Sequence, residues 1–276
     1  MLKRTITGAI YVAIIVGFFL LRDYVDYRLF NVLTFVFCAI GTFEVARAIK
    51  PYLYKGNFTL AVVCGAIFVP VFCLFQYLVG FDGAIACLIS VVILLIYQSA
   101  RTFIVEKSGF KSFLVNALPF IYPTLLLLTI LCANELENGF VCLLLIFVIP
   151  PCADTFAYLV GMICNKIRKG KAKKMCPRLS PKKTWAGAVG GVVGGIVGAI
   201  VAYFVTGKTV SLTVFSVCGA IGSVLTEIGD LFESYIKRKV GIKDMGKIMP
   251  GHGGVMDRID GTTFAAVLIY FIFLLF

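Results

Sequence analysis

Long uninterrupted apolar segments constrain this chain more than any other feature of its sequence. They recur along the 276 residues in runs of about 16 to 23, long enough for a helix to cross a hydrocarbon layer of about 30 Å. Hydrophobic residues make up 60% of the chain and charged residues only 14%, whereas about 25% of the residues of a soluble domain are charged. The sequence therefore predicts an all-α membrane protein that crosses the bilayer several times.

Nine candidate spans are bounded by charged residues or by Pro and Gly. They lie near residues 6–21, 29–49, 58–79, 83–99, 112–132, 139–161, 186–206, 209–229 and 262–275. Lys3 and Arg4 precede the first run as they would in a signal peptide, but no small-residue cleavage site follows it. We expect this run to remain as a helix.

The basic residues predict which side of the membrane each loop occupies. If the N-terminus is cytoplasmic, 23 of the 26 Lys and Arg residues fall on the cytoplasmic side, and only Arg22, Arg28 and Lys208 fall outside. This agrees with the excess of Lys and Arg that cytoplasmic loops carry. The net charge of +12 is then a property of the cytoplasmic face, where it also attracts anionic lipid.

The distribution of polar residues divides the chain into two halves. Residues 1–138, with about five spans, contain few ionisable groups, and Glu44 and Asp82 lie near span ends, so this half is interpreted as a scaffold. Residues 139–276, with about four spans and two basic loops, are interpreted as the catalytic region with a cavity on the cytoplasmic side. The ten cysteines form no CxxC pair, which argues against a thiolate metal site.

The sixth span carries a carboxylate where the bilayer makes one unfavourable. Asp154 lies well inside this span, and Tyr158 follows one turn later on the same face. An ionisable residue at this depth marks a functional site by default, with a structural ion pair as the alternative. The glycines spaced by four in the seventh span predict close helix packing, because no Gly-Lys-Ser/Thr phosphate loop is present.

A cluster of hydroxyl and ammonium groups precedes the seventh span. Ser180, Lys182, Lys183 and Thr184 stand where a helix begins, so their side chains and the free backbone N–H groups are predicted to bind phosphate, with helix capping as the alternative. The basic run upstream, residues 166–178, is interpreted as a solvated surface that faces lipid headgroups.

Carboxylates and basic residues gather again near the C-terminus. Glu227, Asp230 and Ser234 are spaced to share one helical face, and Asp257 and Asp260 are likewise three residues apart. Carboxylates that converge with lysines and arginines indicate a Mg²⁺ ion that holds a phosphorylated substrate, and a structural ion-pair network is the alternative.

The residues from Ser234 to Asp260 resemble the signature of the phosphatidate cytidylyltransferase family across its 27-residue length. Segments 180–185 and 154–161 are similar to two further motifs of that family, so the resemblance covers about residues 140–276. Two positions depart from the family pattern: Ala186 stands where a Glu is expected, and Met249 replaces a more usual Leu, Ile or Phe.

The resemblance implies transfer of a cytidylyl group from CTP to phosphatidate, giving CDP-diacylglycerol and pyrophosphate. Asp230 and Asp257 would be the metal-bridging pair, and Glu227 and Asp260 are further candidate ligands of one Mg²⁺, or of a Mg²⁺ and a second cation. The residues expected near the phosphates are Ser234, Lys237, Arg238, Lys243, His252 and Arg258. A CTP-dependent polyprenol or lipid kinase and a transporter of phosphorylated anions remain as alternatives.

The expected partners are CTP from the cytoplasm, phosphatidate within the bilayer and anionic membrane lipid. No nucleic-acid partner is expected, and a homodimer is considered alongside a monomer. A bacterial plasma membrane is the expected location. His252 is predicted to donate a hydrogen bond to phosphate or nucleotide and not to act as a general base, because the attacking phosphate is already ionised.

Overall fold

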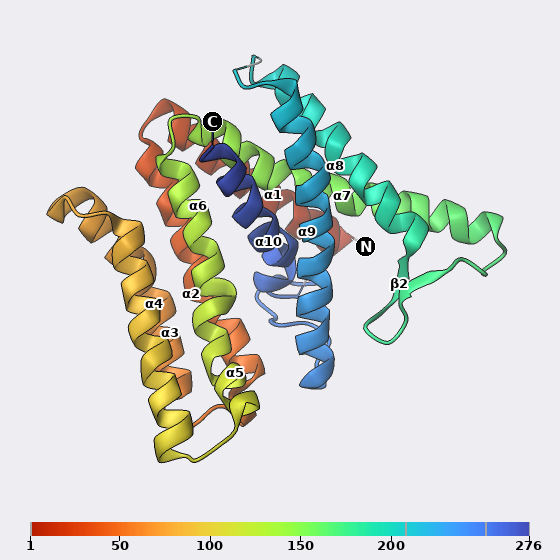
Figure 1. The fold of residues 1–276 in the computed structure, drawn as a ribbon. Helices are drawn as coiled ribbons and strands as arrows, with labels where there is room; N and C mark the ends of the chain where they lie inside the picture. Colours follow the sequence, from red (N-terminus) through yellow and green to blue (C-terminus); the bar gives the residue numbers. More distant parts are fainter. Residues whose placement is uncertain (1, 208, 252, 276) are drawn as a thin grey trace. The chain divides into compact units, whose positions relative to one another are not determined.

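The computed structural model describes residues 2–207, 209–251 and 253–275, so His252 lies outside the described residues. Most of the described chain is helical (Figure 1). The helices are α1 (Leu2–Tyr24), α2 (Phe30–Ala48), α3 (Asn57–Cys73), α4 (Gly83–Ala100), α5 (Phe110–Pro119), α6 (Leu126–Glu135), α7 (Gly139–Ile167), α8 (Trp185–Val205), α9 (Leu212–Lys239) and α10 (Met256–Phe273).

Eight helical segments among the described residues are long and apolar enough to cross a membrane. They are Thr5–Tyr24, Tyr27–Ala48, Asn57–Val79, Gly83–Val105, Phe110–Glu135, Gly139–Ile167, Trp185–Val205 and Leu212–Lys239. The chain is thus a polytopic integral membrane protein, as predicted. Helix α10, the expected ninth span, is not among the eight, so the count of nine stays a prediction.

The helices form two compact units, each assembled from two separate stretches of chain. The first contains Met1–Cys132 and Ile242–Arg258, and the second contains Ala133–Gly241 and Ile259–Phe276. The division after residue 132 lies close to the boundary drawn from the sequence at residue 138. The loop before α10, assigned from the sequence to the catalytic half, is grouped with the first unit.

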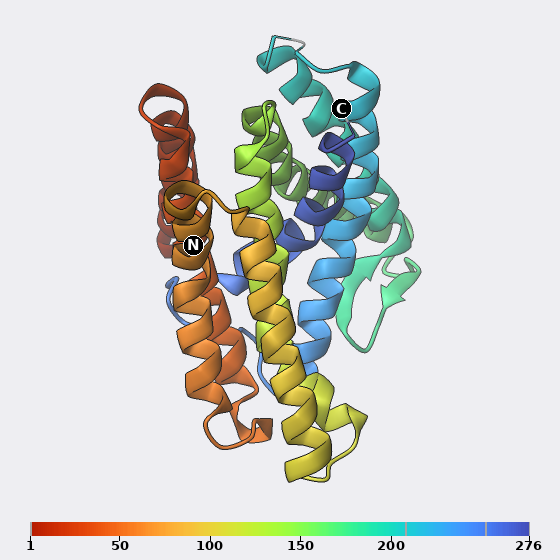
Figure 2. The same ribbon diagram turned by 60° about the vertical axis from the view of Figure 1, so that its left-hand side comes forward.

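In the first unit α2 packs against α3, and α3 and α4 run side by side in both views (Figures 1 and 2). Three of its long apolar helical segments contain π-helical stretches, η3 (Leu74–Val79), η4 (Arg101–Val105) and η5 (Phe120–Leu125). Pro119 and Pro123 adjoin or lie within η5, where the missing N–H groups favour such an irregularity. A hydrogen bond of 2.8 Å between the Thr42 and Thr124 hydroxyl groups joins α2 to η5.

In the second unit α8 packs closely against α7 and α9 through its glycine-rich faces. A Cβ atom at Gly187 would lie 2.8 Å from the Ala157 carbonyl oxygen, and one at Gly194 would lie 2.8 Å from that of Cys152. Both distances are shorter than real Cβ contacts allow. The prediction that these glycines serve helix packing is therefore confirmed.

The basic segment between α7 and α8 folds into a hairpin that the sequence did not indicate. Strand β1 (Lys174–Cys176) pairs antiparallel with β2 (Ser180–Thr184). Strands of three and five residues carry too little periodicity to be recognised among lysines. Residues 174–176 of the basic run, which was expected to be a solvated surface, are therefore paired with β2. Lys166, Lys169 and Lys171 of the same run are exposed, as expected.

Candidate functional site

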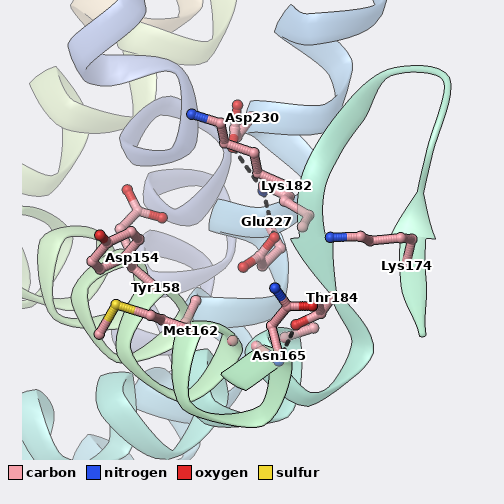
Figure 3. Close-up of a pocket in the computed structure, with 14 residues that line it drawn as sticks. Asp154, Tyr158, Met162, Asn165, Lys174, Lys182, Thr184, Glu227 and Asp230 are labelled. Carbon is pink, nitrogen blue, oxygen red and sulfur yellow. Dashed lines mark hydrogen bonds and ion pairs between the residues drawn. The ribbon is translucent and has the colours of Figure 1, made fainter. Parts of the chain in front are cut away.

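The second unit contains a cavity of about 390 Å³ between α7, the hairpin, the first turn of α8 and α9 (Figure 3). Pockets that bind small molecules in proteins range over about 300–1,000 Å³. The lining residues are Asp154, Ala157, Tyr158, Gly161, Met162, Asn165, Lys174, Lys182, Lys183, Thr184, Gly187, Ala188, Glu227 and Asp230. Three carboxylates and three lysines thus converge on one space.

Lys183 is the electrostatic centre of the cavity. Its ammonium lies 2.5 Å from Glu227 Oε2 and 2.7 Å from Asp230 Oδ2, and the Lys183 side chain is only 18% exposed. Burial by itself would lower the pKa of Lys183, but the charges and hydrogen bonds of Asp230 and Glu227 outweigh it and raise the pKa above 10.5. The lysine therefore stays protonated and holds the two carboxylates together.

The hairpin directs these lysines by strand alternation. Successive side chains of a strand point to opposite faces, so Lys182 is exposed and Lys183 is half-buried, although both line the cavity. Thr184 is buried and caps α8, because its Oγ1 accepts the Gly187 N–H at 3.0 Å. Capping, the alternative considered for this threonine, is what the structure shows. Ser180 pairs with Cys176 in the hairpin and does not line the cavity.

Helix α9 carries the acidic face that its spacing predicted, and it continues ten residues past the expected end of that span at 229. Asp230 accepts a hydrogen bond of 3.4 Å from the Ser234 hydroxyl, which confirms their common face. One turn on, Lys237 donates to Glu233 at 2.6 Å, and Glu233 is completely buried. Arg238 donates from Nε to the Leu179 carbonyl, 3.5 Å away.

Helix α7 forms the opposite wall. Figure 3 shows Asp154, Tyr158 and Met162 on one side of the cavity and Lys174 on the other, with its amine directed inward. Asp154 and Tyr158 both line the cavity, as their i, i+4 spacing predicted.

Asn165 and Glu233 are polar residues of this unit that sequence reasoning missed. Asn165 lines the cavity, and its side-chain oxygen is buried without a hydrogen-bond partner among the described residues. The signal that could have found it is its spacing of eleven residues, three helical turns, from Asp154. Glu233 belongs to the face of α9 next to Asp230. The Asp260 carboxyl group hydrogen-bonds to it and also accepts the Gly261 N–H at 2.8 Å.

The remaining signature residues belong to the first unit. Asp257 Oδ2 accepts the backbone N–H groups of Met245 at 2.9 Å and Gly254 at 2.7 Å, so the carboxylate orders the glycine-rich loop that precedes α10. Lys243 and Arg258 are exposed. Asp230 and Asp257, expected to share a metal, are thus each fixed within a different unit.

The donor atoms of the cavity suit a hard cation. Glu227 and Asp230 offer carboxylate oxygens to one shared cation, the Lys183 ammonium, and Mg²⁺ is commonly held by one or two carboxylates completed by water and substrate phosphates. Within the described part of the chain no group of three His, Cys, Asp or Glu side chains could hold a metal ion by itself. The residues present therefore fit a magnesium ion that arrives with a phosphorylated substrate better than an all-protein site.

Comparison with known proteins places these motifs in a family. Residues 2–276 match the model described as the cytidylyltransferase family. A phosphatidate cytidylyltransferase of Brucella melitensis is 37% identical over 140 residues, which is 48% of this chain and 46% of the relative. Proteins of the same name from Mycobacterium tuberculosis (37% over 139 residues, 50% of this chain and 39% of the relative) and Rickettsia felis (36% over 155 residues, 54% and 65%) are also similar. The chain thus matches about half the length of these curated relatives.

Proposed function

The chain belongs to the cytidylyltransferase family, and from that premise we propose that it transfers the cytidylyl group of CTP to phosphatidate, giving CDP-diacylglycerol and pyrophosphate. The observation that carries the proposal is the cavity of the second unit, where Asp154, Glu227 and Asp230 meet Lys174, Lys182 and Lys183. The names of the similar bacterial proteins support the same lipid substrate.

The reaction is a substitution at phosphorus that needs alignment more than acid–base chemistry. An oxygen of the phosphatidate phosphate forms a new bond to the α-phosphorus of CTP, the bond from that phosphorus to the β-bridging oxygen breaks, and pyrophosphate leaves with the electron pair. The phosphomonoester is largely dianionic at neutral pH, because its second pKa is about 6. No residue therefore has to remove a proton from the nucleophile.

The lysines that line the cavity supply positive charge where the phosphates would lie. Lys174 and Lys182 can neutralise phosphate oxygens directly, since neither is paired with a carboxylate in the described structure. Lys183 keeps Glu227 and Asp230 in place, and Asp154 faces them from α7. Reacting groups held in a fixed geometry gain much of the rate enhancement that substitution reactions show in enzymes.

Glu227 and Asp230 would hold Mg²⁺, and Asp257 and Asp260 would complete the acidic set proposed from the family signature. When bound, the ion supplies charge stabilisation to the phosphates and to the leaving pyrophosphate. Ser234 and the basic residues of the signature are proposed to lie along the phosphates; these basic residues are Lys237, Arg238, Lys243, His252 and Arg258. We place the N-terminus and the cavity on the cytoplasmic side of a bacterial plasma membrane, in line with the distribution of Lys and Arg.

Product analysis tests the proposal. Protein purified in detergent is supplied with CTP, Mg²⁺ and phosphatidate, and the soluble products are separated. The proposal predicts pyrophosphate with no CDP. Release of CDP with a newly phosphorylated lipid would identify a lipid kinase. If neither pyrophosphate nor CDP were released and a phosphorylated anion were taken up into vesicles, the protein would be a transporter.

A further inference from the structure

Glu44 is a buried carboxylate in the half of the chain that the sequence presents as a scaffold. Its side chain lies on α2 and is 1% exposed. Its Oε2 accepts the backbone N–H of Met256, the first residue of α10, at 2.9 Å. The backbone amide of Val255 also interacts with it. A residue near the N-terminus therefore holds a loop that follows it by 212 positions.

Burial of a carboxylate is unfavourable unless hydrogen bonds compensate for the lost water. Free N–H groups at a helix N-terminus provide that compensation, and the helix dipole favours a negative charge there. The other oxygen, Oε1, has no hydrogen-bond partner among the described residues. The hydrogen bonds that the structure gives the Glu44 carboxylate therefore all come from the loop backbone.

The loop is shaped to receive this carboxylate. A Cβ atom at Gly246 or at Gly254 would overlap the Glu44 carboxylate, and one at Gly246 would also lie 2.9 Å from the Gly254 Cα, so the carboxylate can keep its present position only if both residues are glycine. This contact gives a physical reason for two of the glycines in the segment that resembles the family signature.

The same loop peptide binds a second carboxylate. Gly254 donates its N–H to Asp257 at 2.7 Å, two residues before Met256 donates to Glu44. The backbone from Gly254 to Met256 is thus held between the carboxylates of Glu44 and Asp257. A displacement of Glu44 would move the peptide that orients Asp257.

We infer that Glu44 is a positioning residue for Asp257: it fixes the glycine-rich loop and, through it, the direction of the Asp257 carboxylate. The inference rests on the proposed function insofar as Asp257 acts in the reaction. Loss of groups that orient a functional carboxylate commonly lowers activity or metal affinity by 10- to 100-fold.

The first experiment needs no activity. Hydrogen–deuterium exchange is measured on the full-length protein in lipid nanodiscs, for peptides that cover residues 244–257. In Glu44→Ala these peptides should exchange at least about tenfold faster than in wild type. Glu44→Gln retains one carbonyl acceptor, so its exchange rate should lie between those of wild type and Glu44→Ala. Glu137→Gln, an exposed glutamate between α6 and α7, is the matched control and should leave exchange unchanged. Wild-type exchange in Glu44→Ala would overturn the inference.

The second experiment is a double-mutant cycle on pyrophosphate release. Glu44→Gln should lower kcat by about 10- to 100-fold in the wild-type background and by less than about twofold in an Asp257→Asn background, because it acts through that residue. A general loss of folding would lower activity by the same factor in both backgrounds and would overturn the positioning role. Because Gln is nearly isosteric with Glu, this variant keeps the test valid if Glu44→Ala does not fold. A wild-type protein that releases no pyrophosphate would refute the proposed function, while the exchange experiment would still decide the role of Glu44 in the loop.

Discussion

Replacement of Lys183 by methionine is the perturbation whose consequence the structure predicts most directly. Methionine retains the length of the side chain and removes its charge, so Glu227 and Asp230 would face each other without the ammonium that joins them at 2.5 and 2.7 Å. Two neighbouring carboxylates repel, and either they separate or one takes up a proton.

The size of the effect follows from burial. Removing one partner of a buried ion pair destabilises a protein by about 3–5 kcal/mol. Glu227 is only 9% exposed, but the Asp230 side chain is 34% exposed, so solvent screens part of the repulsion. We therefore expect the free energy of unfolding to fall by the lower end of this range, about 3 kcal/mol. The cavity would be distorted, and loss of the same energy from stabilisation of the transition state would reduce the kcat of the enzyme by about 100-fold.

The assay is pyrophosphate release by purified variants at saturating CTP and phosphatidate, together with the thermal denaturation midpoint of each variant. Lys182→Met is the matched control, because this neighbouring lysine is exposed and has no carboxylate partner in the described structure. It should raise the KM for a phosphorylated substrate without lowering the midpoint. If Lys183→Met retained the wild-type kcat and denaturation midpoint, the ion pairs of Lys183 with Glu227 and Asp230 would contribute neither to activity nor to stability, which would refute the expectation.

The stabilisation by the ion pairs of Lys183 with Glu227 and Asp230 should depend on pH in a defined way. The pKa of Lys183 is raised above 10.5 in the folded protein, so its stabilisation is complete below the unfolded value and is lost only as pH rises through the folded one. The difference in denaturation midpoint between wild type and Lys183→Met should therefore stay constant from about pH 6 to about pH 9. A difference that shrinks within this window would show that the lysine is not held as described.

Two further variants test the acidic and basic residues of the signature. Asp257→Asn should reduce kcat by about 100-fold or more, by analogy with removal of one electrostatic stabiliser, and wild-type turnover at saturating Mg²⁺ would contradict its role. Alanine at Lys237 and Arg238 should reduce activity far more than alanine at Lys169 and Lys171, because Lys237 neutralises a buried glutamate whereas the latter pair is exposed. Greater damage from the exposed pair, measured in the same assay, would place the phosphates elsewhere.

The helical spacing of polar residues was the most reliable guide to the site. The shared face of Glu227, Asp230 and Ser234, and that of Asp154 and Tyr158, could be read from intervals of three, four and seven residues because helix geometry fixes which side chains are neighbours. The apolar runs likewise predicted eight of the helices that can span a membrane.

Contacts between distant segments could not be read in this way. Nothing in the sequence near Glu44 indicates that its partner is Met256, because the contact depends on how α2 packs against the loop before α10. The pairing of Lys183 with two carboxylates depends on the β1–β2 hairpin, whose short strands carry no clear periodicity. Tertiary packing decides both, and local patterns do not encode it.

In the proposed reaction the α-phosphate of CTP becomes part of the lipid. This transfer is tested most directly with CTP radiolabelled either at the α-phosphate or at the γ-phosphate, supplied to wild-type protein and to Asp230→Asn in phosphatidate-containing nanodiscs. Wild type should transfer the α-label to lipid and leave the γ-label in soluble pyrophosphate, and Asp230→Asn should slow the appearance of each labelled product by about 100-fold. Appearance of the γ-label in lipid, or equal rates for the two proteins, would contradict the proposal.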